Sequence, residues 1–140
     1  LTAAENVALP LELGGTKPRA ARIEAVAALD SVGLADLADQ PADTLSGGEQ
    51  QRVAIARSLV GDRRLLLTDE PTGALDSLTG ESIMRLLRRR CDEGASVLMA
   101  THDAAHAAWA DRIVFLRDRE LIDETSPQSD AMAFTTGLQP

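Results

Sequence analysis

At 140 residues and 44% hydrophobic content, the chain is long enough for one domain, or part of one, with a hydrophobic core. The formal net charge of −8 argues against the basic surface that grips phosphates, so we expect no nucleic-acid partner. The single cysteine, Cys91, allows no internal disulfide, and no apolar run reaches the ~18 residues that span a bilayer. These features favour a cytosolic setting. Because the sequence opens at Leu1 and not at methionine, we expect a truncated product.

The first part of the chain reads as helical. Thr2 with Glu5 three residues later forms the pattern of a capping box, and Pro10 is expected to limit the helix that follows. Pro18 occupies a typical first helical position, and Gly33 closes this second helix. Its apolar residues recur at helical spacing: Ile23, Val26, Leu29 and Val32.

The stretch 45–52, LSGGEQQR, is the most informative part of the sequence. Gly47 and Gly48 allow the backbone to approach a ligand, and a helix that follows them directs unpaired N–H groups at it. An anion, most plausibly a phosphate, suits that geometry. The structural alternative is a capping box formed by Ser46 and Glu49 at the start of an ordinary helix that ends at Gly61. In this helix Val53, Ala56 and Val60 fall on one face, while the two glutamines of the stretch face elsewhere.

Strands are expected after the helical part. Short apolar runs at 65–68, 96–100 and 112–116 read as buried strands, and the segments between them are long enough for crossover helices, which predicts a parallel sheet. The arginine run 88–90 reads as a solvated helix end. Asp118 is expected to begin the turn of a small hairpin.

Two acidic residues, Asp69 and Glu70, follow the first predicted strand. Ligands of open α/β sheets bind at this carboxyl edge, where an aspartate can hold Mg²⁺ and an adjacent glutamate can polarise an attacking water. The alternative is an ordinary polar strand end. His102 follows the second predicted strand, where a histidine can equally be incidental, and a metal pair with His106 lacks an evident third ligand.

Four motifs resemble those of ATP-binding-cassette ATPases, and they occur in the family's order. The stretch 45–57 resembles the signature motif, 65–72 the Walker B motif with its catalytic glutamate, 73–76 the D-loop, and 101–103 the switch region with its histidine. Within the family, 1–11 and 69–76 are similar to the lipoprotein-release and macrolide-export type of transporter ATPase.

The resemblance implies an α/β fold: a partial P-loop NTPase (RecA-like) core with parallel strands, preceded by an α-helical subdomain. The expected divisions are a helical subdomain at 1–60, the C-terminal part of the core at 61–124, and a disordered tail at 125–140. It also implies ATP and Mg²⁺ as cofactors. Glu70 and His102 would be catalytic and Asp69 would hold the metal, while the nucleotide would be bound by Ser46, Gly47, Gly48, Glu49 and Asp76. Independently of the resemblance, Asp76 followed by Ser77 can be a turn and a helix cap.

The phosphate loop of such enzymes, G-x-x-x-x-G-K-[ST], is absent from these 140 residues. Their only lysine, Lys17, lies between Thr16 and Pro18, and the Q-loop glutamine cannot be assigned either. We therefore expect ATP hydrolysis by the full-length protein and negligible hydrolysis by this chain alone.

The leading hypothesis is an ATP-hydrolysing subunit, present here as a fragment, that powers a membrane permease through nucleotide-driven dimerisation. Its partners would be a second ATPase subunit, head to tail, and an integral membrane permease, which places it in the cytoplasm on the inner face of the membrane. The first alternative is a non-catalytic or degenerate subunit that lends its signature to a partner's site. Others are a cassette ATPase of chromosome maintenance or translation, which the acidic charge disfavours, and a plain α/β domain with coincidental motifs.

Overall fold

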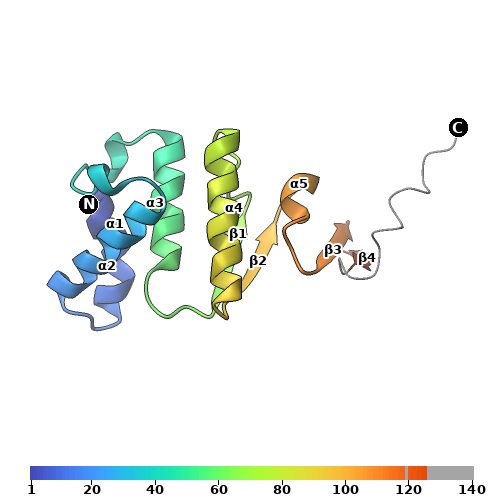
Figure 1. Ribbon diagram of the computed structural model, residues 1–140, viewed down its shortest axis with the longest axis horizontal. Helices are drawn as coiled ribbons and strands as arrows, with labels where there is room; N and C mark the ends of the chain where they lie inside the picture. The colour runs from blue at the N-terminus through green and yellow to red at the C-terminus, as the bar shows by residue number, and fades with distance from the viewer. Residues whose placement is uncertain (119, 126–140) are drawn as a thin grey trace, which may run out of the picture. The chain divides into compact units, whose positions relative to one another are not determined.

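The computed structural model describes residues 1–118 and 120–125 (Figure 1). The chain divides into two compact units, Leu1–Ala100 and Thr101–Pro140. The first contains α1 (Ala3–Leu13), α2 (Pro18–Ser31), two 3₁₀ turns (Ala35–Leu37 and Ala42–Thr44), α3 (Gly47–Leu59), β1 (Leu65–Asp69), α4 (Ser77–Asp92) and β2 (Ser96–Ala100). The second contains α5 (Ala104–Ala107), β3 (Ile113–Arg117) and β4 (Glu120–Thr125). No helix in the described part of the chain is long and apolar enough to cross a membrane.

Helix α1 begins with the predicted capping box. The Thr2 hydroxyl oxygen accepts the Glu5 N–H at 3.2 Å, and a Glu5 carboxylate oxygen accepts the Thr2 N–H at 2.8 Å. The helix nevertheless runs through Pro10 to Leu13, so the expectation that proline limits it was wrong. An internal proline costs about 3 kcal/mol. Burial offsets this cost, since one face of α1 is packed inside the unit: Ala3, Ala4, Val7, Ala8 and Leu11.

The Thr2 cap can be tested by substitution. We expect Thr2→Ala to lower the free energy of unfolding by about 1 kcal/mol, because the Glu5 N–H at the start of α1 loses its acceptor. Denaturant unfolding followed by circular dichroism measures the change. Thr2→Ser keeps the hydroxyl and should unfold close to wild type, whereas equal losses in the two variants would contradict the role of the hydroxyl.

Helix α2 starts at Pro18, as predicted, and only the second half of the expected stripe is buried, Leu29 and then Val32 at the end of the helix. Its buried residues are Ala21, Ala25 and Leu29, four apart along the helix, whereas Ile23 is 66% exposed. The alanine side chains are small enough to let α2 pack closely on α1 and α3. The apolar periodicity misplaced the first half of the stripe because it counted large residues and ignored alanine.

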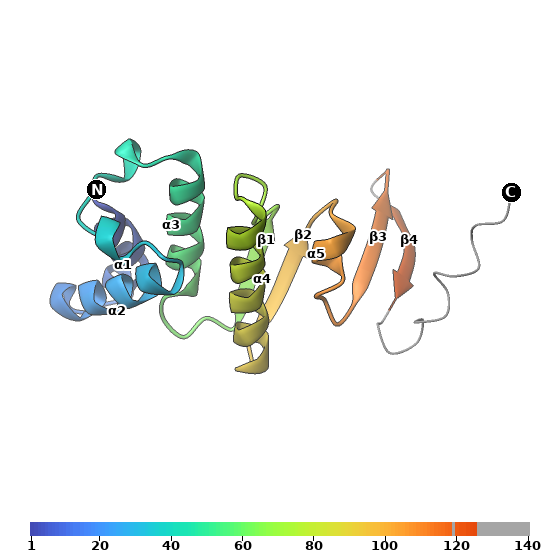
Figure 2. The ribbon, with the colours of Figure 1, turned by 45° about the horizontal axis from the view of Figure 1, so that its top comes forward.

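Strands β1 and β2 pair in parallel, from Leu65 opposite Ser96 to Asp69 opposite Ala100, with α4 beside them (Figure 2). The prediction of a buried first strand was only half right. Leu66 is 3% exposed, but Leu65 and Leu67 are 59% and 66% exposed, and Leu98 on β2 is also 66% exposed. Because successive strand residues point to opposite faces, Leu66 lies on one face of the pair and Leu65 and Leu67 lie on the other. Other parts of the unit therefore cover only the face that carries Leu66.

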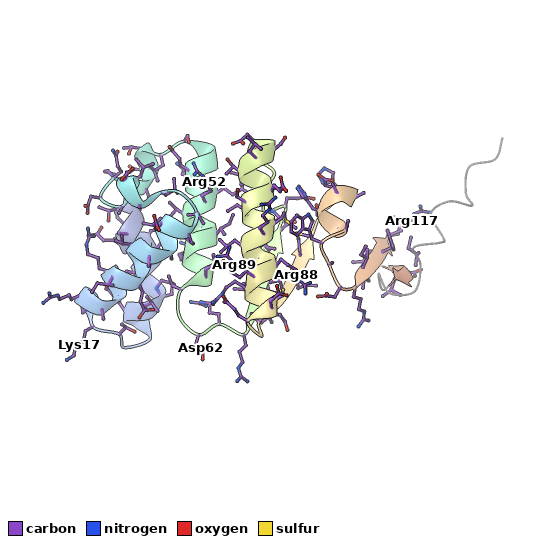
Figure 3. All side chains as sticks on the ribbon, in the orientation of Figure 1. Lys17, Arg52, Asp62, Arg88, Arg89 and Arg117 are labelled. Atoms are coloured by element: carbon purple, nitrogen blue, oxygen red, sulfur yellow. The ribbon has the colours of Figure 1, made fainter. Side chains whose placement is uncertain are left out.

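Helix α4 packs through a buried stripe, and two of its C-terminal arginines make contacts that the sequence analysis did not predict. The buried residues are Gly80, Ile83, Met84 and Leu87. Arg88, which Figure 3 labels on α4, pairs with Asp92 at 3.0 Å. Arg90 pairs with Glu93 at 3.0 Å. Arg90 also donates to the Leu59 carbonyl oxygen at 3.4 Å, which ties the end of α4 to the end of α3. This part of the arginine run is therefore not simply a solvated helix end.

In the second unit β3 pairs with β4 in antiparallel fashion, which confirms the predicted hairpin. Asp118 has a left-handed φ of +51° at the turn, and a register shift lies between Phe115 and Leu116. The described strands form two two-stranded sheets, β1 with β2 and β3 with β4, and the expectation that the 112–116 strand belongs to the parallel sheet stays a prediction. Apart from Thr125, which ends β4, the tail predicted at 125–140 lies outside the described residues.

Candidate functional site

The start of α3 is held by a complete capping box, as one of the two interpretations of the sequence predicted. The Ser46 hydroxyl oxygen accepts the Glu49 N–H at 3.4 Å, while a Glu49 carboxylate oxygen accepts from the Ser46 N–H at 2.8 Å and hydroxyl at 2.7 Å. The hydroxyl hydrogen bond from Ser46 lowers the pKa of the Glu49 carboxyl below its usual range. The box satisfies two N–H groups of the first turn, and helical geometry leaves those of Gly47 and Gly48 directed out of the helix start.

The two glycines have different surroundings. A Cβ atom on Gly47 would have no atom within 4 Å, so its backbone is open to a ligand. A Cβ atom on Gly48 would lie 3.1 Å from the Ala74 carbonyl oxygen and 3.5 Å from Leu75 Cδ2. The second glycine therefore allows the helix start to approach the loop that follows β1.

The loop 70–76 begins where β1 ends. The Glu70 N–H donates to the Ala100 carbonyl oxygen at 3.0 Å, and the Glu70 backbone has a left-handed φ of +44°. Thr72 is buried next to Gly80 of α4, where a Cβ on the glycine would lie 3.4 Å from Thr72 Cβ. The loop therefore packs against α3 on one side and α4 on another.

Sequence reasoning missed Gln51, which joins α3 to this loop. Its side-chain nitrogen Nε2 donates to the Glu70 carbonyl oxygen at 3.0 Å, and its oxygen Oε1 accepts the Ala74 N–H at 3.1 Å. The apolar pattern of α3 predicts that Gln51 lies away from the buried face. The available signal was its position one turn before the buried Ile55, on the side of the helix that faces the protein.

Asp69 immediately precedes the loop 70–76, and Asp76 is its last residue. Asp69 is exposed at the carboxyl end of β1, where one carboxylate fits the usual protein share of a Mg²⁺ shell completed by phosphates and water. No cluster of three or more potential metal ligands occurs among the described residues. Asp76 caps α4, accepting the Thr79 N–H at 3.0 Å and the Thr79 hydroxyl at 2.6 Å, and this hydroxyl bond lowers the pKa of Asp76. The cap interpretation is thus confirmed, while a role of Asp76 at a nucleotide stays a prediction.

His102 belongs to the second compact unit, and its predicted catalytic role stays a prediction. In the same unit His106 Nδ1 lies 3.3 Å from an Asp103 carboxylate oxygen, which is a local contact across one turn of α5. The structure thus places Ser46, Gly47, Gly48, Glu49, Asp69, Glu70 and Asp76 in the first unit and His102 in the second.

A family model described as "ABC transporter" matches residues 1–73, more than half of the chain. The chain belongs to the ABC transporter family. The macrolide export ATP-binding/permease protein MacB of Aggregatibacter actinomycetemcomitans is 48% identical over 126 residues, 89% of this chain and 19% of that protein. The protein of the same name from Chromobacterium violaceum is 43% identical over 141 residues, 100% of this chain and 22% of that protein.

Solved ABC cassettes share the fold. The ATP-binding cassette MJ0796, described as a dimer in a post-hydrolysis state bound to ADP and Pi, matches with a TM-score of 0.84 and 42% identity over 90% of this chain and 56% of that one. The predicted α/β, P-loop NTPase fold class is therefore confirmed. This chain spans about a fifth of the curated relatives described above and 56% of the solved cassette. Members of the family generally bind ATP with Mg²⁺.

Proposed function

We propose that this chain supplies the signature and Walker B parts of an ATP-binding and ATP-hydrolysing subunit that powers a membrane permease. The observation that carries the proposal is the direct packing of a glycine-rich helix start, at Gly48, on the loop that begins with Glu70. The helix start to which we assign phosphate binding and the carboxylate to which we assign catalysis thus belong to neighbouring segments of one compact unit.

Each side chain has a role in this proposal. Ser46 and the N–H groups of Gly47 and Gly48 bind the phosphates of a nucleotide carried by a second ATPase subunit, arranged head to tail. Asp69 holds Mg²⁺, which neutralises charge on the phosphates, and Glu70 polarises the attacking water. His102 contacts the γ-phosphate. Glu49 and Asp76 act beside the nucleotide, Glu49 by holding Ser46 and Asp76 by fixing the end of the D-loop at the start of α4.

The proposed partners follow from this role. ATP binding and hydrolysis close and open the dimer, and an integral membrane permease converts that motion into transport. The relatives' name, ATP-binding/permease protein, supports such a pairing. We therefore place the subunit in the cytoplasm, on the inner membrane face through the permease, with helical (1–60) and core (61–124) divisions as predicted from the sequence.

An ATPase assay on the full-length protein that contains this sequence tests the proposal. We expect Mg²⁺-dependent turnover on the order of 1 s⁻¹ or faster, abolished by EDTA, and no measurable turnover by the 140-residue chain alone. Absence of hydrolysis by the full-length protein, combined with stimulation of a second ATPase subunit, would instead support a degenerate subunit that lends its signature. Turnover by the 140-residue chain itself would contradict the expectation that hydrolysis needs a phosphate loop, which these 140 residues lack.

A further inference from the structure

The backbone of the loop after Glu70 depends on one side chain from outside it. Three successive N–H groups, those of Gly73, Ala74 and Leu75, have acceptors in the structure. Gly73 donates to the Glu70 carbonyl oxygen at 3.1 Å and Leu75 to the Thr72 carbonyl oxygen at 3.0 Å, so both use the loop itself. Ala74 donates to the Gln51 side chain at 3.1 Å. The middle N–H of the loop is thus satisfied by helix α3.

The same side chain holds the other end of the loop. Gln51 Nε2 donates to the Glu70 carbonyl oxygen, which accepts from Gly73 as well and so uses both of its lone pairs. Glu70 adopts a left-handed backbone, with φ +44°, that a non-glycine residue rarely takes unless its surroundings hold it. A hydrogen bond to its carbonyl group fixes the peptide plane that follows Glu70 and therefore helps to set the direction of the carboxylate.

The geometry allows little freedom between α3 and the loop. Gly48 lies one turn before Gln51, and a Cβ atom added to it would lie 3.1 Å from the Ala74 carbonyl oxygen. The loop and α3 are therefore closely packed at this point. The hydrogen bond from Gln51 to the Glu70 carbonyl oxygen is partly buried, so water competes less for it than at an open surface. Displacement of the start of α3 would therefore displace the loop.

We propose that Gln51 is a positioning residue that couples the start of α3 to Glu70 through its two-point contact with the loop 70–76. The proposal rests on the proposed function, in which α3 touches one nucleotide and Glu70 serves another. When a partner's nucleotide binds at Ser46–Gly48, any displacement of the start of α3 is passed through Gln51 to the loop. The loop carries the Glu70 carboxylate, which activates water in the chain's own site. The two sites of the dimer are then linked by one amide group.

Gln51→Met in the full-length protein tests the proposal, because methionine keeps the length of the side chain and removes both hydrogen bonds. We expect kcat to fall at least 10-fold while the KM for ATP changes less than twofold, since Gln51 does not touch the chain's own nucleotide. Gln51→Glu keeps an acceptor for Ala74 but sets an oxygen against the Glu70 carbonyl oxygen, and should lose kcat similarly. Ser58→Ala is the matched control, because the Ser58 hydroxyl donates to the Ile55 carbonyl oxygen within α3, at 2.7 Å, and should leave kcat unchanged.

Hydrogen exchange gives a readout that needs no hydrolysis. The Ala74 amide should exchange at least 10-fold faster in Gln51→Met than in wild type or Ser58→Ala, with the melting temperatures of the three proteins similar. Wild-type kcat in Gln51→Met, or a loss of kcat that tracks a general loss of stability, would overturn the proposal. If the wild-type protein hydrolyses no ATP, the proposed function fails; unchanged Ala74 exchange in Gln51→Met would refute the contact itself.

Discussion

Glu70→Gln in the full-length protein is expected to hydrolyse ATP at least 100-fold more slowly than wild type while binding ATP with unchanged affinity. The amide has the same shape as the carboxylate but cannot draw a proton from water, and positioned general bases typically contribute 10²–10⁴-fold. The hydrogen bonds of Glu70 to Ala100 and Gln51 are made by its backbone N–H and carbonyl groups, so these bonds survive the substitution. Single-turnover hydrolysis and calorimetric ATP binding measure the two quantities separately.

Glu81→Gln is the matched control for this experiment. Glu81 lies on the exposed side of α4 and pairs with Arg85 at 2.7 Å, so the same chemical change there should leave turnover at the wild-type level. An exposed pair of this kind contributes little to stability. Turnover of Glu70→Gln equal to that of Glu81→Gln would remove Glu70 from the catalytic role and leave it a polar strand end.

The local signals in the sequence were reliable where neighbouring residues decide the structure. Ser46 with Glu49, and Thr2 with Glu5, predicted the starts of α3 and α1 because a capping box is complete within four residues. The Glu81 and Arg85 pair also follows from helical spacing alone. The candidate site residues come from motifs that are equally short and contiguous, and their roles stay predictions.

The rest required contacts that are distant in the sequence. Pro10 lies inside a helix because packing against α2 and α3 outweighs its local cost, and no window around Pro10 contains that information. Gln51 contacts Glu70, 19 residues away, so its role is visible only once the loop is folded onto α3. The exposed face of β1 and β2 has the same explanation. The apolar side chains of Leu65 and Leu67 predicted burial, but burial also requires another element that packs against them, which the local sequence does not show.

The packing of Gly48 on the loop gives the second large expected effect. Gly48→Val should lower the free energy of unfolding by about 1–3 kcal/mol, because the added Cβ would lie 3.1 Å from a backbone oxygen that cannot rotate away. The helix start and the loop must then separate. In a Glu70→Gln background, which slows turnover, we also expect ATP-dependent dimerisation to weaken at least 10-fold, as measured by analytical ultracentrifugation.

Gly47→Val separates the two effects. A Cβ at Gly47 meets no atom within 4 Å, so this variant should unfold like wild type, yet its side chain projects where the proposed partner's phosphate would lie. Weak dimerisation in both variants, with loss of stability only in Gly48→Val, would mean that both glycines serve the ligand and that Gly48 also allows the approach of α3 to the loop. Equal stability of the two variants would contradict the close packing of Gly48, and full dimerisation of Gly47→Val would place the nucleotide elsewhere.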